Sequence, residues 1–229
     1  MKKLVHRLID CSKDLKVLLL VGLFFLFHHS GNAQVSAYFF SEELGSYSEI
    51  TGGTVAYAAP WDNHTTGAAV LANIGFTFDY DSSSYTTCYI SPNGFITFGA
   101  TQPTTTTYAP ISIATAYEGA ISAMGRDLIS NTNPITYTTI GSAPNRIFVV
   151  QWKDAERKSN TGVLNFQIRL YETTNEIRLH YGFCFPDDTA FTAAQVGLRG
   201  PNNSFLSNVN NRLQAGVNIN NVWFLKSTP

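Results

Sequence analysis

The chain has 229 residues, of which 44% are hydrophobic, 13% aromatic and only 14% charged, and its formal net charge is −1. A chain of this length can bury a core without disulfide bridges. Its sparse and balanced charge excludes the basic stripe that binding to a nucleic-acid backbone requires.

The first 33 residues have the features of a secretory signal peptide. Five basic residues precede the eleven-residue apolar run 17–27, and small and polar residues follow it. A helix needs about 20 residues to span a bilayer, so this run is too short. We therefore expect cleavage after Ala33. A buried helix or a membrane anchor is the alternative, which the β-rich sequence downstream disfavours.

The mature chain, residues 34–229, is predicted to form a single domain that is secreted or held at the cell surface. Without the leader, the 15 basic and 16 acidic residues fall to ten and fourteen, a net charge of −4. All ten basic residues lie from Arg126 onward. No later apolar run could span a membrane, and we expect no nucleic-acid partner.

Short runs of β-branched and aromatic residues recur between Gly, Asn and Pro turn signals throughout the mature chain. This pattern predicts an all-β fold, an antiparallel β-sandwich with a jelly-roll-like order. We expect strands over residues 73–80, 85–91, 94–99, 120–128, 135–140, 145–155, 163–172, 175–182, 194–200 and 221–225. Residues 120–128 could also form a short helix, and residues 102–110, QPTTTTYAP, are expected to form a loop.

The clearest turn signal is Asn93-Gly94, which lies between the β-prone runs of YISPNGFITFG, residues 89–99. Asn-Gly adopts positive φ at low cost, and the flanking strands require a chain reversal. We interpret Pro92-Asn93-Gly94 as a turn explained by its backbone geometry alone, with no catalytic side chain in it or beside it.

Two later regions indicate how their strands are buried. Residues 145–155, NRIFVVQWKDA, are apolar on both faces for most of their length, which predicts a central strand covered on both sides. Residues 163–172 and 175–182 alternate between apolar and polar side chains, which predicts one buried and one solvated face. His180 falls on the predicted solvated face.

The loop between these two strands must contain an even number of residues if their apolar side chains share a face. A two-residue loop, Thr174-Asn175, places Tyr171 opposite Arg178. A four-residue loop, residues 172–175, places Arg169 opposite Arg178. Because two opposed arginines repel each other, we favour the shorter loop.

An ordered set of segments resembles a known family. YISPNGFITFG, AISAMGRDL, APNRIFVVQWKDA, LNFQIRLYETTNEIRLHYG and AQVGLRG follow one another as in a domain found directly after the signal peptide of secreted Bacteroidota proteins. Those proteins often carry fibronectin type III modules and a C-terminal secretion signal. The chain is more distantly similar to the nidogen-type extracellular domain, through the FQ-x-x-L strand and its hairpin.

The resemblance implies a β-sandwich with an extracellular, adhesive and non-catalytic role. This chain ends at NNVWFLKSTP, where such proteins usually continue into further modules. The domain could therefore be a piece of a longer protein or a stand-alone version.

The residues themselves indicate no catalytic site. His64 and His180 are the only histidines of the mature chain, and no G-x-S-x-G elbow is present. The acidic residues form no glycosidase or calcium-loop signature, and the two cysteines and two histidines lack zinc-site spacing. We therefore predict no enzymatic activity, no metal site and no cofactor.

Two features remain as candidate functional or structural sites. Trp61, in the loop PWDNHT, is the best candidate for an exposed ring that stacks on a sugar, with loop anchoring as the alternative. Cys88 and Cys184 are the only cysteines of the mature chain. Export allows a disulfide between them, and two buried free thiols are the alternative.

Together these observations predict a secreted adhesion or recognition module with a glycan or protein ligand. Two alternatives stay open: an accessory module or part of an extracellular hydrolase, and a ligand-free spacer. The oligomeric state is left open.

Overall fold

The computed structural model describes residues 35, 38–39, 41–62, 68–158, 162–185, 194–204, 209–211 and 222–224. They belong to a compact unit that runs from Ala33 to Pro229. The predicted signal peptide, its cleavage site and His64 lie outside the described residues. Within the part of the chain that is described, no helix is long and apolar enough to cross a bilayer.

The described elements are β-strands. Their bounds are β1 (Glu42–Leu44), β2 (Thr54–Tyr57), β3 (Trp61–Asp62), β4 (Val70–Tyr80), β5 (Ser83–Ser91), β6 (Phe95–Phe98), β7 (Gly119–Gly125), β8 (Leu128–Ser130), β9 (Ile135–Ile140), β10 (Ile147–Arg157), β11 (Val163–Tyr171), β12 (Ile177–Phe185), β13 (Gln195–Arg199), β14 (Val209–Asn211) and β15 (Val222–Phe224). Every strand predicted from the sequence has a counterpart here, and residues 120–128 form strands rather than a helix.

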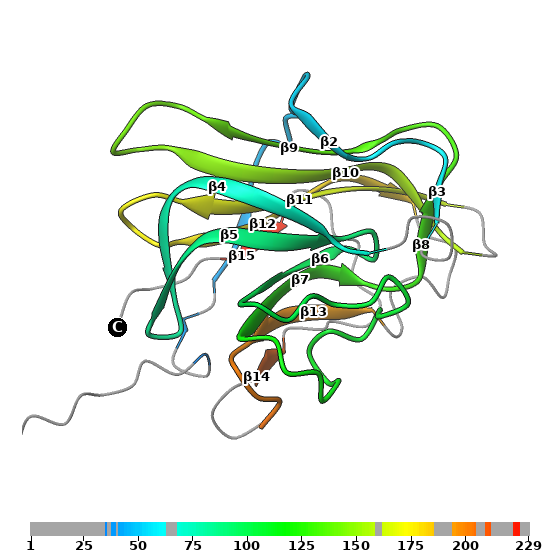
Figure 1. Cartoon of the computed structure of the whole chain (residues 1–229). Coiled ribbons are helices and arrows are strands. Elements are labelled where there is room, and N and C mark those ends of the chain that lie inside the picture. Colours follow the sequence, from blue (N-terminus) through cyan, green and yellow to red (C-terminus); the bar gives the residue numbers. More distant parts are fainter. Residues whose placement is uncertain are drawn as a thin grey trace, which may run out of the picture. The chain divides into compact units, whose positions relative to one another are not determined.

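The strands form two main antiparallel sheets, which confirms the predicted β-sandwich (Figure 1). One sheet has seven strands: β12, β11, β10, β8 and β3 follow one another, while β9 joins β10 and β2 joins β9. The other has six strands in the order β14-β13-β7-β6-β5-β4, and β1 pairs with β15 in a separate ribbon. Strands β4–β7 and β9–β12 are mainly meanders of consecutive neighbours. This differs from the Greek-key order of a jelly roll, because consecutive strands usually lie next to each other in a sheet.

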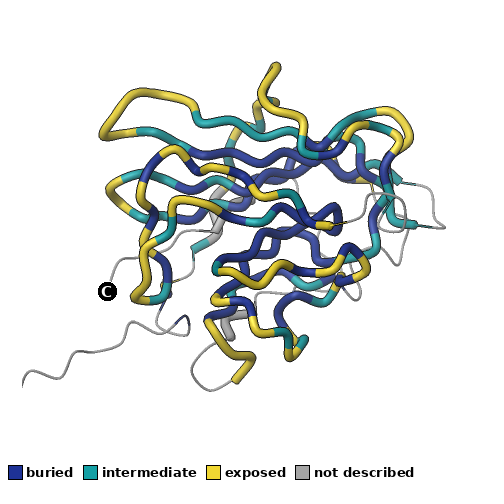
Figure 2. The backbone as a smooth tube through the Cα atoms, in the orientation of Figure 1, coloured by how far each residue is buried: buried dark blue, intermediate teal, exposed yellow. Residues whose placement is uncertain are grey.

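The core lies between the facing sides of the two sheets. Along β4 the even-numbered residues from Ala72 to Tyr80 are buried and the odd-numbered ones are exposed, as expected for a strand with one solvated face. In the seven-stranded sheet, the rings of Trp152 and Phe166 stack with their centroids 5.1 Å apart. Figure 2 shows buried residues along the central strands and exposed residues in many of the turns.

Strand β10 confirms the prediction of a central strand covered on both faces. It pairs with β9 on one side and with β11 on the other, and residues 148–152 are all buried. A β-bulge interrupts its pairing with β11 between Trp152 and Ala155. Asp154, inside this bulge, has a φ of 45°, which is uncommon for a residue other than glycine.

The Pro92-Asn93-Gly94 turn does more than reverse the chain. Asn93 is fully buried, and its Nδ2 donates to the carbonyl oxygens of Thr105 and Thr107 at 2.7 and 3.0 Å. Its Oδ1 accepts from the amide of Leu128 at 3.1 Å. The interpretation that backbone geometry alone explains this turn is therefore wrong for Asn93, which anchors the 102–110 loop to the sheet.

The β11–β12 hairpin corrects the predicted loop length. Arg169 lies opposite Arg178, so the loop has four residues, 172–175, although its even parity is as predicted. The expected repulsion is offset because each arginine has its own acceptor. Arg178 forms an ion pair with Glu176, and the Nε of Arg169 donates to Gln167 Oε1 at 2.8 Å.

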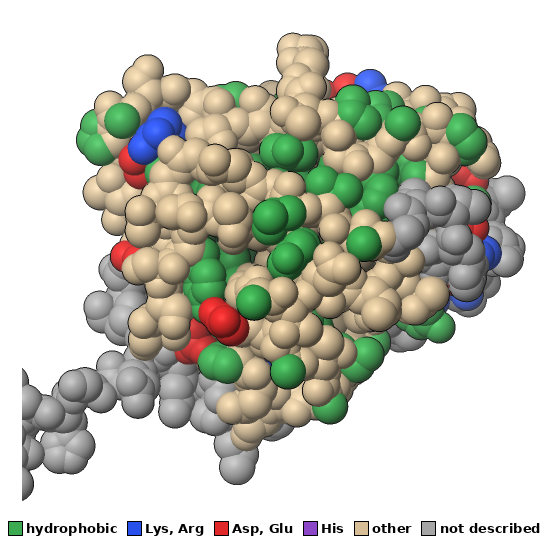
Figure 3. Space-filling model, viewed as in Figure 1, with side chains coloured by type: hydrophobic (Ala, Val, Ile, Leu, Met, Phe, Trp, Pro, Cys, Tyr) green, Lys and Arg blue, Asp and Glu red, His purple; other side chains and the backbone are tan. Residues whose placement is uncertain are grey.

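The surface carries few charges, in keeping with the sequence. Figure 3 shows a face with scattered Lys, Arg, Asp and Glu side chains and with hydrophobic side chains near its centre. No basic stripe is visible on this face.

Candidate binding site

A row of directly opposed residues crosses the outer face of the seven-stranded sheet. Val55 on β2 lies opposite Thr136 on β9, and Thr136 lies opposite Gln151 on β10. Gln151 then faces Gln167 on β11, which faces His180 on β12. Because opposed residues of antiparallel strands share one face, these five side chains form a continuous line.

The chain segment that joins β1 to β2, residues 45–53, crosses one half of this row, and we call it the strap. Gln151 holds it like a neighbouring strand: its Oε1 accepts from the amide of Ile50 at 2.8 Å, and its Nε2 donates to the Ile50 carbonyl at 3.3 Å. Gln167 Nε2 donates to the Ser48 carbonyl at 2.9 Å. Two side-chain amides therefore supply hydrogen bonds that a sheet edge would otherwise provide.

The strap also packs closely on β12. A Cβ atom placed on Gly182 would lie 2.6 Å from the ring of Tyr47, closer than real Cβ contacts allow. Glycine at position 182 is therefore what lets the Tyr47 ring lie directly on the strand.

The strap covers the face of β11 and β12 that was predicted to be solvated, so this face is buried. Gln167 is fully buried and His180 is 6% exposed, so the prediction of a solvated His180 is wrong. Burial, reinforced by the positive charges of Arg169 and Arg178, lowers the pKa of His180 from 6.5 to about 3. This imidazole is neutral at physiological pH and is not poised for acid–base chemistry.

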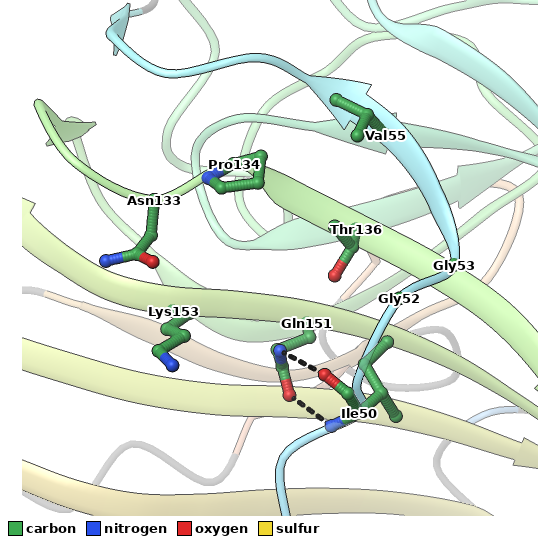
Figure 4. Close-up of a pocket in the computed structure, with 9 residues that line it drawn as sticks. All are labelled: Ile50, Gly52, Gly53, Val55, Asn133, Pro134, Thr136, Gln151 and Lys153. Carbon is green, nitrogen blue, oxygen red and sulfur yellow. Dashed lines mark hydrogen bonds between the residues drawn. The ribbon is translucent and has the colours of Figure 1, made fainter.

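Beside the strap, the other half of the row opens into a hollow of about 280 Å³. Its described lining comes from the strap, β2, the turn before β9, and strands β9 and β10. The lining residues are Ile50, Gly52, Gly53, Val55, Asn133, Pro134, Thr136, Gln151 and Lys153. Figure 4 shows the strap backbone along one side and β9 and β10 beneath, with the Thr136 side chain between them.

Three polar groups of the hollow have hydrogen-bonding capacity to spare. The Nδ2 of Asn133 donates to Thr132 Oγ1 at 3.1 Å and to Asp154 Oδ2 at 2.9 Å, which leaves its Oδ1 as an acceptor. The Thr136 hydroxyl can donate and accept. The Lys153 ammonium donates to Glu49 Oε2 at 2.6 Å and keeps two further hydrogens.

The bulge in β10 fixes one side of the hollow. The Asp154 amide donates to Asn165 Oδ1 at 2.9 Å, and Asn165 Nδ2 donates to Asp154 Oδ1 at 3.2 Å. Asp154 also holds Asn133, so both neighbours lock this unusual backbone in place. Bulges of this kind re-aim side chains next to functional sites.

A family model described as NIDO related matches residues 37–223. This chain belongs to the NIDO-related family. The match confirms the distant resemblance to the nidogen-type domain and indicates an extracellular module. No curated protein and no solved structure matches the chain. The link to Bacteroidota surface proteins and to fibronectin type III modules stays a prediction.

In this NIDO-related domain, Trp61 does not present an open ring. It is 2% exposed, and its Nε1 donates to the Asn133 carbonyl at 2.8 Å. The prediction of an exposed, sugar-stacking Trp61 is therefore wrong, and the loop-anchoring alternative holds. By binding the Asn133 backbone, Trp61 supports the wall of the hollow from behind.

Cys88 and Cys184 are free, buried thiols, so the candidate disulfide is not formed. Cys88 lies on β5 in the six-stranded sheet, whereas Cys184 lies on β12 in the other, where its Sγ donates to the Asn165 carbonyl at 3.5 Å. Burial raises the pKa of both thiols, that of Cys184 to about 11. The thiolate is therefore disfavoured at both positions, and the cysteines act as small apolar residues.

One feature of the sequence points to a polar contact beside the hollow. Gln151 is a polar residue in the middle of the apolar run FVVQW, and such a residue needs a buried partner. No local sequence pattern marks the other polar residues of the hollow, which are Asn133, Thr136 and Lys153. Only the fold brings them together. Among the described residues, no group of three His, Cys, Asp or Glu side chains could hold a metal ion.

Proposed function

We propose that this domain is a secreted, non-catalytic recognition module that binds a glycan or a protein outside the cell. Membership of the NIDO-related family supports the extracellular setting. The hollow beside the strap supports recognition, because it combines apolar contacts with a few fixed polar groups, as ligand sites usually do.

The observation that carries the proposal is the chemistry of the described lining. It combines the apolar side chains of Ile50, Val55 and Pro134 with a few polar groups that are already held by hydrogen bonds. What the hollow offers is hydrogen bonding from Asn133, Thr136 and Lys153. Such a site favours binding over turnover.

A binding screen of residues 34–229 against a glycan array and a panel of extracellular matrix proteins tests the proposal. We expect saturable binding to one of them and no product from polysaccharide or peptide substrates. Thr136→Trp, which fills the hollow, should abolish binding. Ile140→Trp is the matched control, because it places the same ring four residues along the same face of β9, outside the hollow.

Two results would contradict this function in different ways. Turnover of a polysaccharide or peptide that is lost on mutating a single acidic residue would make the domain part of a hydrolase. A complete lack of binding to glycans and proteins would leave a ligand-free spacer.

A further inference from the structure

We propose that the hollow is a saccharide site that accepts the hydroxyl groups of a neutral, terminal sugar. This inference rests on the proposed recognition function and adds to it the place and the chemical class of the ligand. The floor of the hollow is the open end of the row of opposed residues, where Val55, Thr136 and Gln151 lie side by side on three strands.

The polar groups of the hollow match the two-sided chemistry of a sugar hydroxyl, which donates one hydrogen bond and accepts others. Lys153 supplies donors, Asn133 Oδ1 supplies an acceptor, and the Thr136 hydroxyl can act as either. A ligand that only donates or only accepts would satisfy part of this set. A polyhydroxylated ligand satisfies all of it.

Apolar side chains accompany these groups. Ile50, Val55 and Pro134 line the hollow, and Val55 is 51% exposed. They offer van der Waals contact to the C–H faces of a sugar ring while the polar groups bind its edge. The combination of apolar walls and few polar groups is what fixes ligand orientation in small-molecule sites.

The charge balance of the hollow selects a neutral sugar over an acidic one. Lys153 alone among the described lining residues carries a charge, and the Glu49 carboxylate neutralises it at 2.6 Å. An acidic sugar would meet Glu49 as well as Lys153, so it would gain little from the lysine. Removing the Glu49 charge should therefore expose Lys153 to acidic ligands.

The hollow is held open by contacts that exist without ligand. Gln151 ties the strap to β10, and the Asp154 bulge holds Asn133 in position. Groups that are already fixed lose little freedom on binding, which lowers the cost of association. The volume of about 280 Å³ lies near the lower limit of small-molecule sites, and this size fits the end of a glycan chain better than a long stretch of it.

The test uses residues 34–229 on an array of neutral, sialylated and sulfated oligosaccharides, followed by titration with the best neutral ligand. We expect binding to neutral glycans. Thr136→Val removes one hydroxyl with little change of shape and should weaken binding about tenfold. Thr136→Trp should abolish binding, whereas Ile140→Trp should leave it unchanged.

Glu49→Gln provides an independent test of the charge argument. This variant should gain binding to sialylated or sulfated glycans that the parent domain ignores, while its thermal unfolding stays the same. A parent domain that prefers acidic glycans, or a Glu49→Gln variant with unaltered selectivity, would overturn the assignment of a neutral sugar.

Failure of the site and failure of the proposed function give different results. Neutral-glycan binding that survives Thr136→Trp, in a variant shown to be folded by circular dichroism, places the site elsewhere and keeps the function. Binding to matrix proteins alone keeps recognition and rejects the saccharide. Binding to no ligand at all rejects both.

Discussion

The two ends of the row across the seven-stranded sheet differ in what covers them, although both begin as outward-facing positions of ordinary strands. At the β11–β12 end, Gln167 and His180 are 0% and 6% exposed beneath the strap. At the β2–β9 end, Val55 is 51% exposed and Thr136 lines the hollow. Polar side chains in equivalent positions are thus structural at one end and available to a ligand at the other.

At the covered end, the Gln167 side chain is held by hydrogen bonds on both its nitrogen and its oxygen. Gln167 Nε2 donates to the Ser48 carbonyl and to Gln151 Oε1, at 2.9 and 2.7 Å. Its Oε1 accepts two bonds from the Arg169 guanidinium, at 2.8 and 2.6 Å. Buried polar groups stabilise a fold when satisfied and destabilise it when one partner is removed. Substitutions at the two ends should therefore differ sharply in their effect on stability.

The largest difference is expected for Gln167→Ala. It leaves the Ser48 carbonyl, Gln151 and Arg169 without their shared partner, so we expect the free energy of unfolding to fall by about 3 kcal/mol. The matched change at the open end, Thr136→Ala, should alter it by less than about 0.5 kcal/mol. Urea unfolding of both variants measures these changes. Equal losses of unfolding free energy would show that the two ends do not differ in their contribution to stability.

Gly182→Ala should lower the free energy of unfolding by somewhat less, about 2 kcal/mol, because the new Cβ meets the Tyr47 ring. The strap should then become a preferred site of proteolytic cleavage. Adding Tyr47→Ala removes the clash, so the double variant should lose less stability than the sum of the two single variants. Strict additivity would argue against contact between these residues.

Acid should weaken the covered end through His180. Its pKa of about 3 in the folded state lies below the ordinary value of 6.5, so between these values the unfolded chain binds the proton and the folded chain does not. The stabilisation is fully present above pH 6.5 and is lost as the pH falls towards 3, by at most about 1.4 kcal/mol per pH unit.

His180→Gln should remove this contribution. Chemical unfolding at pH 7 and at pH 5.5 measures it, and the parent domain should lose about 1 kcal/mol more than the variant over that interval. An identical pH dependence of the two proteins would mean that His180 takes up its proton without opening the strap.

The smallest effect on stability is expected at the Lys153–Glu49 pair beside the hollow. Both side chains are partly exposed, at 35% and 42%, and exposed ion pairs contribute little. Glu49→Gln should therefore change the free energy of unfolding by less than about 0.5 kcal/mol. A larger loss in thermal or urea unfolding would mean that this pair, rather than Gln151 and Gln167, holds the strap.

Local pattern determined much of the fold. Strand β9 spans Ile135–Ile140 as predicted, and the doubly apolar run at 145–155 is the central strand β10. Alternation along β11 and β12 also determined the even parity of their loop. These features depend on residues within a few positions of one another, and side-chain period and turn propensity act over that range.

Only the tertiary structure decided which outward positions are covered. The strap residue Ile50 binds Gln151 across 101 positions of sequence, and Ser48 binds Gln167 across 119. Trp61 is buried in the core, and its Nε1 donates to the carbonyl of Asn133, 72 positions away. Alternation shows that a strand has two faces, but it does not show which segment will lie on the second one. That depends on the long-range packing of the strap, which buried His180 and left Thr136 beside an open hollow.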